Sequence, residues 1–130
     1  MGTTQEQAVL DFFLEWECES LDASRIERIL NRMNQDVRWH VNAWDPPLVG
    51  QNAVREELQR LAPLYRDYRS EILAIASVNQ TVFTQRLDSM VLGRKALTQH
   101  ITGVYEVDTD GKISAQRDYF DRKEVDAQLS

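Results

Sequence analysis

The chain has 130 residues, 42% of them hydrophobic and 28% charged, which suits one ordinary globular domain. Fifteen basic residues against 21 acidic ones leave a formal net charge of −6. No stretch gathers lysine and arginine into the basic patch that phosphate recognition needs, so the composition argues against nucleic acid and anionic membranes as partners.

The sequence also carries no sign of a membrane span or of export. No apolar run approaches the roughly 20 residues of a membrane span. The first residues, MGTTQEQ, lack the basic and apolar regions of a signal peptide. The single cysteine, Cys18, cannot form an internal disulfide. We therefore expect a cytoplasmic protein that forms one domain over residues 1–130.

The first half of the chain predicts three helices and one short strand. Asn52 is expected to cap the third helix, which Pro63 would kink or end. The strand, from Val37 to Asn42, precedes Pro46 and Pro47, which break regular structure. The apolar residues at helical spacing are Val9, Phe12, Phe13 and Trp16, then Ile26, Ile29, Leu30 and Met33, then Val54, Leu58, Leu61 and Tyr65.

The second half predicts strands over about residues 68–78, 81–92, 96–107 and 113–121. The segment from Asp108 to Lys112 is a turn signal between the last two strands. Helices followed by a run of strands are typical of an α+β fold. We expect a cone-shaped, curved antiparallel β-sheet, with the N-terminal helices packed on its concave face and a pocket enclosed between them.

Three charged residues stand out on these predicted strands. Arg86 and Asp88 are two apart, so their side chains point to the same face of a strand, and Asp118 lies on the last strand. In a pocket, an arginine could hold two carboxylates that share one proton, one acting as acid and the other as base. The alternative is a solvated ion pair, which contributes about 0–1 kcal/mol. Asp121, on the opposite face, is more typical of a solvated or helix-capping residue.

Three local motifs point to a known family. The first is an asparagine at the end of a short strand, followed by Pro-Pro, glycine and a helix, over Asn42 to Val54. The second is the Arg-Leu-Asp motif of residues 86–88, and the third runs from Gly111 to Asp121. Together, over about Asp36 to Val125, they resemble the limonene-1,2-epoxide hydrolases, which have a nuclear-transport-factor-2-like (SnoaL-like) fold.

The resemblance implies that water opens an epoxide in one step, without a metal or a cofactor. Asp118 would be the general base, Asp88 the general acid that protonates the epoxide oxygen, and Arg86 the bridge between them. Asn42 would hold the water, together with a tyrosine two residues earlier. This sequence has His40 at that position, and histidine forms hydrogen bonds with a shorter reach and titrates near neutral pH.

The remaining expectations concern the substrate and the assembly. The apolar wall that would contact a small hydrophobic epoxide is expected to consist of Leu61, Tyr65, Met90 and Phe120. The alternative is that these four residues belong to the ordinary hydrophobic core. The resemblance also implies a homodimer. No metal site is expected, because His40 and His100 lie far apart in the sequence and lack further ligands.

Two other classes of function stay open at this point. A ketosteroid-isomerase-like or polyketide-cyclase-like enzyme would use one carboxylate to move a proton beside a carbonyl group. A non-catalytic small-molecule-binding module would need no charged trio at all, because a fold alone does not define a function.

Overall fold

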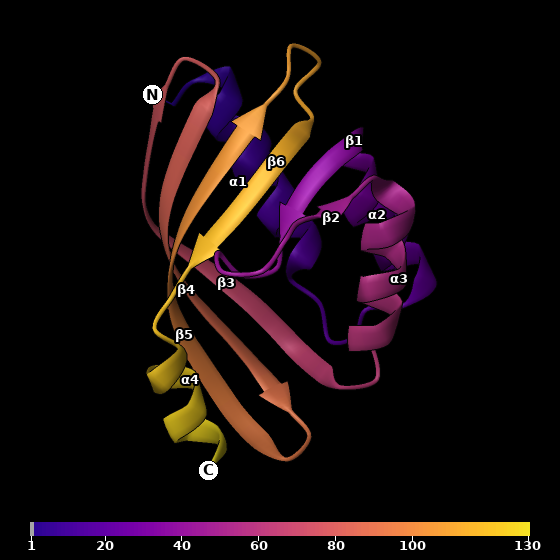
Figure 1. Cartoon of the computed structure of the whole chain (residues 1–130), viewed down its shortest axis with the longest axis vertical. Coiled ribbons are helices and arrows are strands. Elements are labelled where there is room, and N and C mark those ends of the chain that lie inside the picture. Colours follow the sequence, from indigo (N-terminus) through magenta and orange to yellow (C-terminus); the bar gives the residue numbers. More distant parts are fainter. Residues whose placement is uncertain (1) are drawn as a thin grey trace.

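A computed structural model describes residues 2–130 and confirms the α+β fold class (Figure 1). The described chain forms one six-stranded sheet and four helices. The elements in chain order are α1 (Thr4–Trp16), α2 (Ala23–Asn31), β1 (Met33–His40), β2 (Leu48–Val49), α3 (Gln51–Leu61), β3 (Tyr65–Val78), β4 (Thr81–Leu92), β5 (Lys95–Val107), β6 (Ile113–Tyr119) and α4 (Arg122–Leu129).

The sheet has the strand order β2-β1-β6-β5-β4-β3. Strands β3 to β6 form the expected antiparallel meander. Strand β1, however, pairs with β6 in the parallel direction, so the sheet is mixed rather than purely antiparallel. The long connection between β1 and β6 explains the difference, because only neighbouring strands joined by tight turns must run antiparallel.

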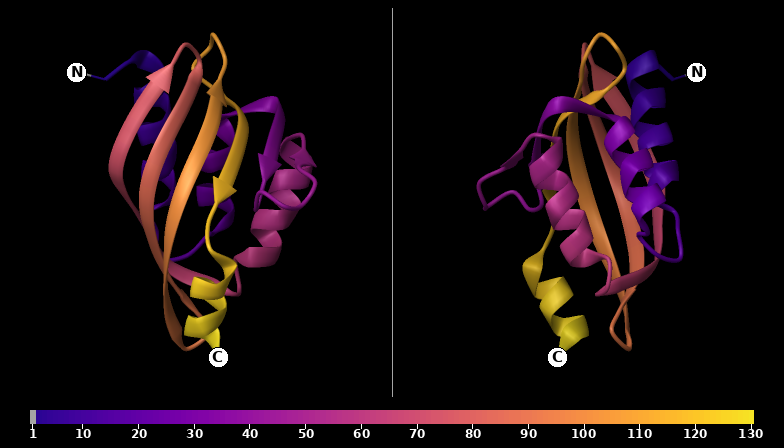
Figure 2. Two further views of the ribbon diagram at one scale, coloured as in Figure 1. Left: turned by 60° about the vertical axis from the view of Figure 1, so that its left-hand side comes forward. Right: turned by 90° about the vertical axis from the view of Figure 1, so that its right-hand side faces the viewer.

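Helices α1, α2 and α3 cover one face of the curved sheet (Figure 2). Helix α1 packs against β3, β4 and β5, whereas α2 and α3 pack against each other and against β1. The four apolar residues predicted for the first helix are all buried on α1. Each such side chain contributes about 1.5–3 kcal/mol by leaving water. The burial pattern of β4 agrees with helices on one face of the sheet, because alternate residues of this strand are buried.

Several predicted boundaries move in the structure. Met33 begins β1 instead of extending the second helix, and Tyr65 begins β3 instead of closing the third. Strand β1 ends at His40, so Asn42 lies beyond the strand in a turn. The cap of α3 is Gly50, not Asn52, and its φ of 88° is a conformation that glycine adopts without the cost paid by other residues.

Helix α4 was not predicted as a helix. It buries none of its residues, so it leaves no apolar periodicity in the sequence. Its N-cap is Asp121, whose carboxylate accepts a hydrogen bond from the Lys123 backbone at 2.9 Å, as the capping interpretation predicted. Glu124 of this helix accepts a hydrogen bond from His100 at 2.9 Å, on the exposed side of β5.

Candidate active site

The structure brings Arg86 and Asp88 of β4 together with Asp118 of β6. The Arg86 Nε and Nη2 atoms donate to the two oxygens of Asp88 at 3.1 and 2.9 Å. Its Nη1 and Nη2 atoms donate to the two oxygens of Asp118 at 3.0 and 3.1 Å. One planar guanidinium therefore makes a two-point contact with each carboxylate, which fixes both carboxylates relative to each other.

This trio is buried. Arg86, Asp88 and Asp118 are 1%, 0% and 9% exposed, so the interpretation as a solvated surface ion pair is excluded. If both carboxylates were ionised, the cluster would carry one excess negative charge inside the protein. One proton on either carboxyl group would make the cluster neutral. The arrangement is therefore suited to hold a single proton between two carboxyl groups.

Neighbouring side chains keep the arginine charged and in place. Burial alone would lower the pKa of Arg86, but the attraction of Asp118 and the hydrogen bonds to both carboxylates raise it well above its usual value. Its Nη1 atom also donates to the Tyr105 hydroxyl at 2.6 Å, and its guanidinium lies 4.4 Å from the ring centre of Phe13. Arg86 is thus a fixed positive charge between the two acids.

Strand β5, which lies between β4 and β6, leaves room for this bridge at Gly103. Gly103 pairs with Asp118 on one side and with Thr84 on the other. A Cβ atom at this position would overlap the Tyr105 hydroxyl and lie 2.9 Å from the Arg86 Nη1 atom. Sequence reasoning missed Gly103, although a glycine inside a predicted strand is a signal that another group approaches closely.

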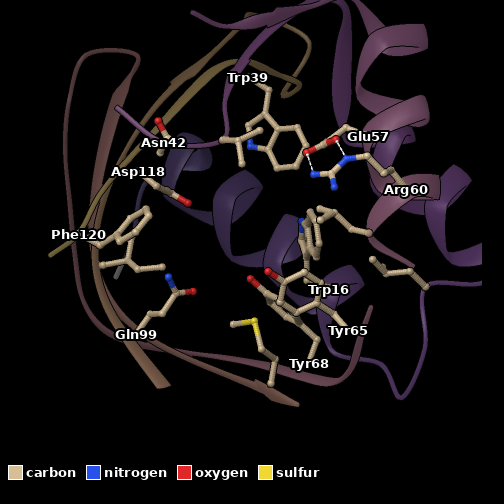
Figure 3. A pocket seen from close by; sticks show the side chains of 15 residues that line it. Trp16, Trp39, Asn42, Glu57, Arg60, Tyr65, Tyr68, Gln99, Asp118 and Phe120 are labelled. Carbon is tan, nitrogen blue, oxygen red and sulfur yellow. Dashed lines mark hydrogen bonds and ion pairs between the residues drawn. The ribbon is translucent and has the colours of Figure 1, made fainter. Parts of the chain in front are cut away.

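A cavity of about 240 Å³ opens between the helices and the sheet beside the trio (Figure 3). Its volume lies just below the range of about 300–1,000 Å³ typical of small-molecule sites, so it suits a compact ligand. The lining is mainly apolar and aromatic. It includes all four predicted wall residues, Leu61, Tyr65, Met90 and Phe120.

The members of the trio differ in their access to this cavity. Asp118 belongs to the lining and points into the cavity (Figure 3). Within residues 2–130, the lining does not include Arg86 or Asp88. Tyr68, which sequence reasoning missed, does line the cavity, and its hydroxyl donates to the Asp88 Oδ2 atom at 3.3 Å. A buried hydroxyl from Ser70, the residue paired with Asp88 across β3 and β4, donates to Oδ1 at 2.7 Å.

Of the two predicted water-positioning residues, the structure places only one in the lining of the cavity. Asn42 lines the cavity, but its amide already bonds Asp45, donating to Oδ2 at 2.9 Å and accepting from the backbone at 3.0 Å. His40 is not in the lining, and its Nδ1 atom lies 3.3 Å from the Asp45 carbonyl oxygen. The residues on either side of it, Trp39 and Val41, line the cavity instead.

The assumption behind the pairing of His40 with Asn42 was therefore wrong. Residues two apart share a face only along a continuous strand. Strand β1 ends at His40, and the chain turns before it reaches Asn42. The shared parity that was inferred from the sequence does not extend across that turn.

Within residues 2–130, no group of three or more His, Cys, Asp or Glu side chains is arranged to hold a metal ion. No helix in the same range combines the length and apolarity needed to cross a bilayer.

Comparisons with solved structures show the same fold. An LEH-like epoxide hydrolase from M. tuberculosis superimposes with a TM-score of 0.79 at 23% identity, covering 97% of this chain and 92% of that one. A candidate polyketide cyclase from Xanthomonas campestris pv. campestris gives 0.78 at 18% identity, covering 98% and 97%. A hypothetical protein from Catenulispora acidiphila DSM 44928, with a ketosteroid isomerase-like fold and bound trimethylamine, gives 0.78 at 12% identity, covering 94% and 91%.

These three similarities establish the fold, which is shared by proteins of different kinds. A sequence-family model is more specific than the fold. The model of the limonene-1,2-epoxide hydrolase catalytic domain matches residues 5–129, nearly the whole chain. That range contains the arginine and the two aspartates that meet beside the cavity. The chain therefore belongs to the limonene-1,2-epoxide hydrolase family.

Proposed function

We propose that this protein is an epoxide hydrolase, which converts a small hydrophobic epoxide to a vicinal diol by general acid–base attack of water. One observation carries the proposal. Arg86 makes a two-point contact with both Asp88 and Asp118, and this buried trio adjoins a mainly apolar cavity. A module that only binds an apolar ligand would have no use for this arrangement, and its burial would carry a cost.

Asp118 is the proposed base, because it is the member of the trio that lines the cavity. Its carboxylate would take a proton from a water molecule as the water oxygen attacks an epoxide carbon. The carbon–oxygen bond of the epoxide breaks, and the released oxygen takes the proton held on the Asp88 side. Asp118 ends protonated and Asp88 ionised, so one proton must return between them before the next turnover.

Arg86 would serve both halves of this reaction without giving up its own proton. It remains positively charged, because its pKa is raised well above the usual value by its carboxylate partners despite its burial. It therefore stabilises whichever carboxylate is ionised, before and after turnover. Because the guanidinium is already oriented, little reorganisation is needed when the charge moves from one acid to the other.

The cavity supports a compact, largely apolar substrate. Apolar contacts from Leu61, Met90 and Phe120 would hold the hydrocarbon part. A polar rim is present as well, since Glu57 and Arg60 both line the cavity and form an ion pair at 2.7 Å (Figure 3). We expect small cyclic or linear epoxides to fit better than large ones.

The deciding experiment is a single turnover in ¹⁸O-water with enzyme in excess over a panel of epoxides. Direct attack by water puts ¹⁸O into the diol of the first turnover, whereas attack by a carboxylate gives an unlabelled first diol. Mass spectrometry of the diol distinguishes the two. An unlabelled first diol contradicts the mechanism, and no diol from any epoxide contradicts the activity.

A second candidate is proton transfer beside a carbonyl group, as in a ketosteroid-isomerase-like or polyketide-cyclase-like enzyme. The observation that favours it is the fold similarity to the Xanthomonas and Catenulispora proteins, whose TM-scores of 0.78 nearly equal the 0.79 of the LEH-like epoxide hydrolase. Deuterium exchange into a ketone in D₂O would reveal it. Exchange without any diol formation from epoxides would select this candidate.

The expected homodimer also remains a proposal. The sheet face opposite α1 carries exposed apolar surface, including the side chain of Phe83. Sedimentation equilibrium of the protein beside a Phe83→Glu variant tests it. A dimer that the substitution converts to a monomer supports this face as the interface, whereas a monomeric unmodified protein overturns the proposal.

A further inference from the structure

The hydroxyl of Tyr68 stands between Asp88 and the cavity. Asp88 is fully buried and lies outside the cavity lining of the described chain, whereas Tyr68 is part of that lining. The two side chains meet at 3.3 Å, through the Tyr68 hydroxyl and the Asp88 Oδ2 atom. Figure 3 shows the Tyr68 side chain reaching toward the middle of the cavity, into which Asp118 also points. If Asp88 acts as the acid, the Tyr68 hydroxyl therefore lies between its carboxyl group and the cavity.

The other contacts of Asp88 lead away from the cavity. Its Oδ1 atom accepts from Ser70 at 2.7 Å and from the Arg86 Nε atom at 3.1 Å, and its Oδ2 atom accepts from Arg86 Nη2 at 2.9 Å. Of these partners, neither Ser70 nor Arg86 contributes to the cavity lining of residues 2–130. Tyr68 is therefore the contact that joins Asp88 to the place where a substrate would bind.

The backbone holds Tyr68 in this position by an irregularity of β3. The pairing of β3 with β4 shifts by one residue between Arg66 and Arg69, and Asp67 within the shift has a φ of 55°. Such bulges re-aim side chains and are frequent beside active sites. Backbone hydrogen bonds of 2.8 and 3.2 Å with Cys18 fix the Tyr68 main chain. Its ring also packs on Trp16, at 5.2 Å between centres.

We propose that Tyr68 delivers the proton of Asp88 to the epoxide oxygen, a step that rests on the epoxide hydrolase function proposed above. Asp88 begins protonated on Oδ2 and donates to the Tyr68 oxygen, while the Tyr68 hydroxyl donates to the epoxide oxygen. As the epoxide carbon–oxygen bond breaks, that oxygen takes the Tyr68 proton and Tyr68 takes the Asp88 proton. Tyr68 is unchanged, Asp88 becomes a carboxylate, and Asp118 holds the proton from water.

The surroundings of Tyr68 suit a relay rather than a proton store. Burial, reinforced by the nearby Asp88 carboxylate, raises the pKa of Tyr68 well above its usual value. The phenol therefore does not persist in an ionised form, and it loses its proton only while it receives another. A proton passed in this way leaves no buried phenolate charge behind, which would be costly at this site.

The first test is Tyr68→Phe, which removes the hydroxyl and keeps the ring that packs on Trp16. We expect kcat for epoxide hydrolysis to fall by about 10²- to 10⁴-fold with a small change in KM, the range typical of lost acid–base catalysis. The matched control is Tyr119→Phe, because Tyr119 is 47% exposed and lies outside the cavity lining. Thermal melting of both variants checks that they remain folded.

Two further readouts separate a relay from a structural role. A trifluoromethyl group beside the epoxide makes the released oxygen less basic, so its departure depends less on proton donation. The fold-loss in kcat of Tyr68→Phe relative to the unmodified enzyme should therefore be smaller with that substrate. The double variant Tyr68→Phe with Asp88→Asn should be about as slow as the slower single variant, because both residues act in one chain.

The outcomes distinguish this inference from the function on which it rests. An unmodified protein that hydrolyses no epoxide overturns the proposed function. An active protein whose Tyr68→Phe variant stays within about threefold in kcat overturns the relay alone. The relay is also overturned if the fold-losses in kcat of the two single variants multiply in the double variant. It is overturned as well if the loss of kcat in Tyr68→Phe is the same with and without the trifluoromethyl group, and both outcomes leave the hydrolase function intact.

Discussion

The charged trio and the turn after β1 are two parts of the same site, and they are built in opposite ways. Arg86, Asp88 and Asp118 lie on regular strands, at most 9% exposed, and bond one another directly. Asn42 instead lies in a turn, and its side chain is held by the exposed residue Asp45. The geometry of the proposed acid and base therefore depends on the sheet, whereas the predicted water contact depends on a loop.

This difference matters for how each part responds to substitution. Breaking the trio leaves charges in the core without partners, so both stability and activity should suffer. Changing the turn affects groups near solvent, where water can replace lost hydrogen bonds and local opening costs little. We therefore expect the trio to give large effects and the turn to give small ones.

The largest expected effect is that of Asp118→Asn. Asparagine has nearly the same shape and can still accept hydrogen bonds from Arg86, but it cannot take a proton from water. We expect kcat to fall by about 10²- to 10⁴-fold, measured as initial diol formation. Asp121→Asn is the matched control, because Asp121 caps α4 and asparagine caps helices equally well. Diol formation by Asp118→Asn at an unaltered rate would remove Asp118 from the mechanism.

The next effect concerns stability. Arg86→Met removes the only positive charge in the trio and leaves two buried acids facing each other. We expect the free energy of unfolding, from urea titration, to fall by about 3–5 kcal/mol, as found when one partner of a buried ion pair is removed. Replacing both acids in the same chain, with Asp88→Asn and Asp118→Asn, should recover much of this loss. A triple variant as unstable as Arg86→Met would show that packing, not charge, is responsible.

A smaller effect is expected on β5, where the sheet accommodates the bridge. Gly103→Ala places a Cβ atom against the Tyr105 hydroxyl and 2.9 Å from Arg86. Such overpacking costs about 1–3 kcal/mol of folding free energy, and displacement of the guanidinium should lower kcat as well. Thr102→Ala is the control, since Thr102 is exposed on the same strand. A Gly103→Ala protein with unchanged melting temperature and kcat would mean that the backbone of β5 accommodates the added Cβ atom without displacing Arg86.

The same contrast explains what could be predicted from the sequence. Arg86 and Asp88 were correctly placed on one face because β4 is continuous there, and strand parity holds along a continuous strand. The fold class followed from helices preceding strands. The parallel pairing of β1 with β6 was not predictable from local patterns, because it joins segments more than 70 residues apart. Tyr68 was missed because a bulge sets its direction, and no residue pattern announces that bulge.

The smallest predicted effects compare His40 with Asn42. Asn42→Ala removes a polar group that lines the cavity, and the loss of one hydrogen bond of about 1 kcal/mol would lower kcat/KM roughly fivefold. His40→Tyr should change kcat/KM by less than that, although it restores the residue type expected at this position, because His40 lies outside the lining of the described chain. Steady-state kinetics of the two variants side by side measure the difference. A clear gain in His40→Tyr would mean that the end of β1 and the following turn rearrange when substrate binds and bring position 40 to the water, so that this mobile segment would complete the site.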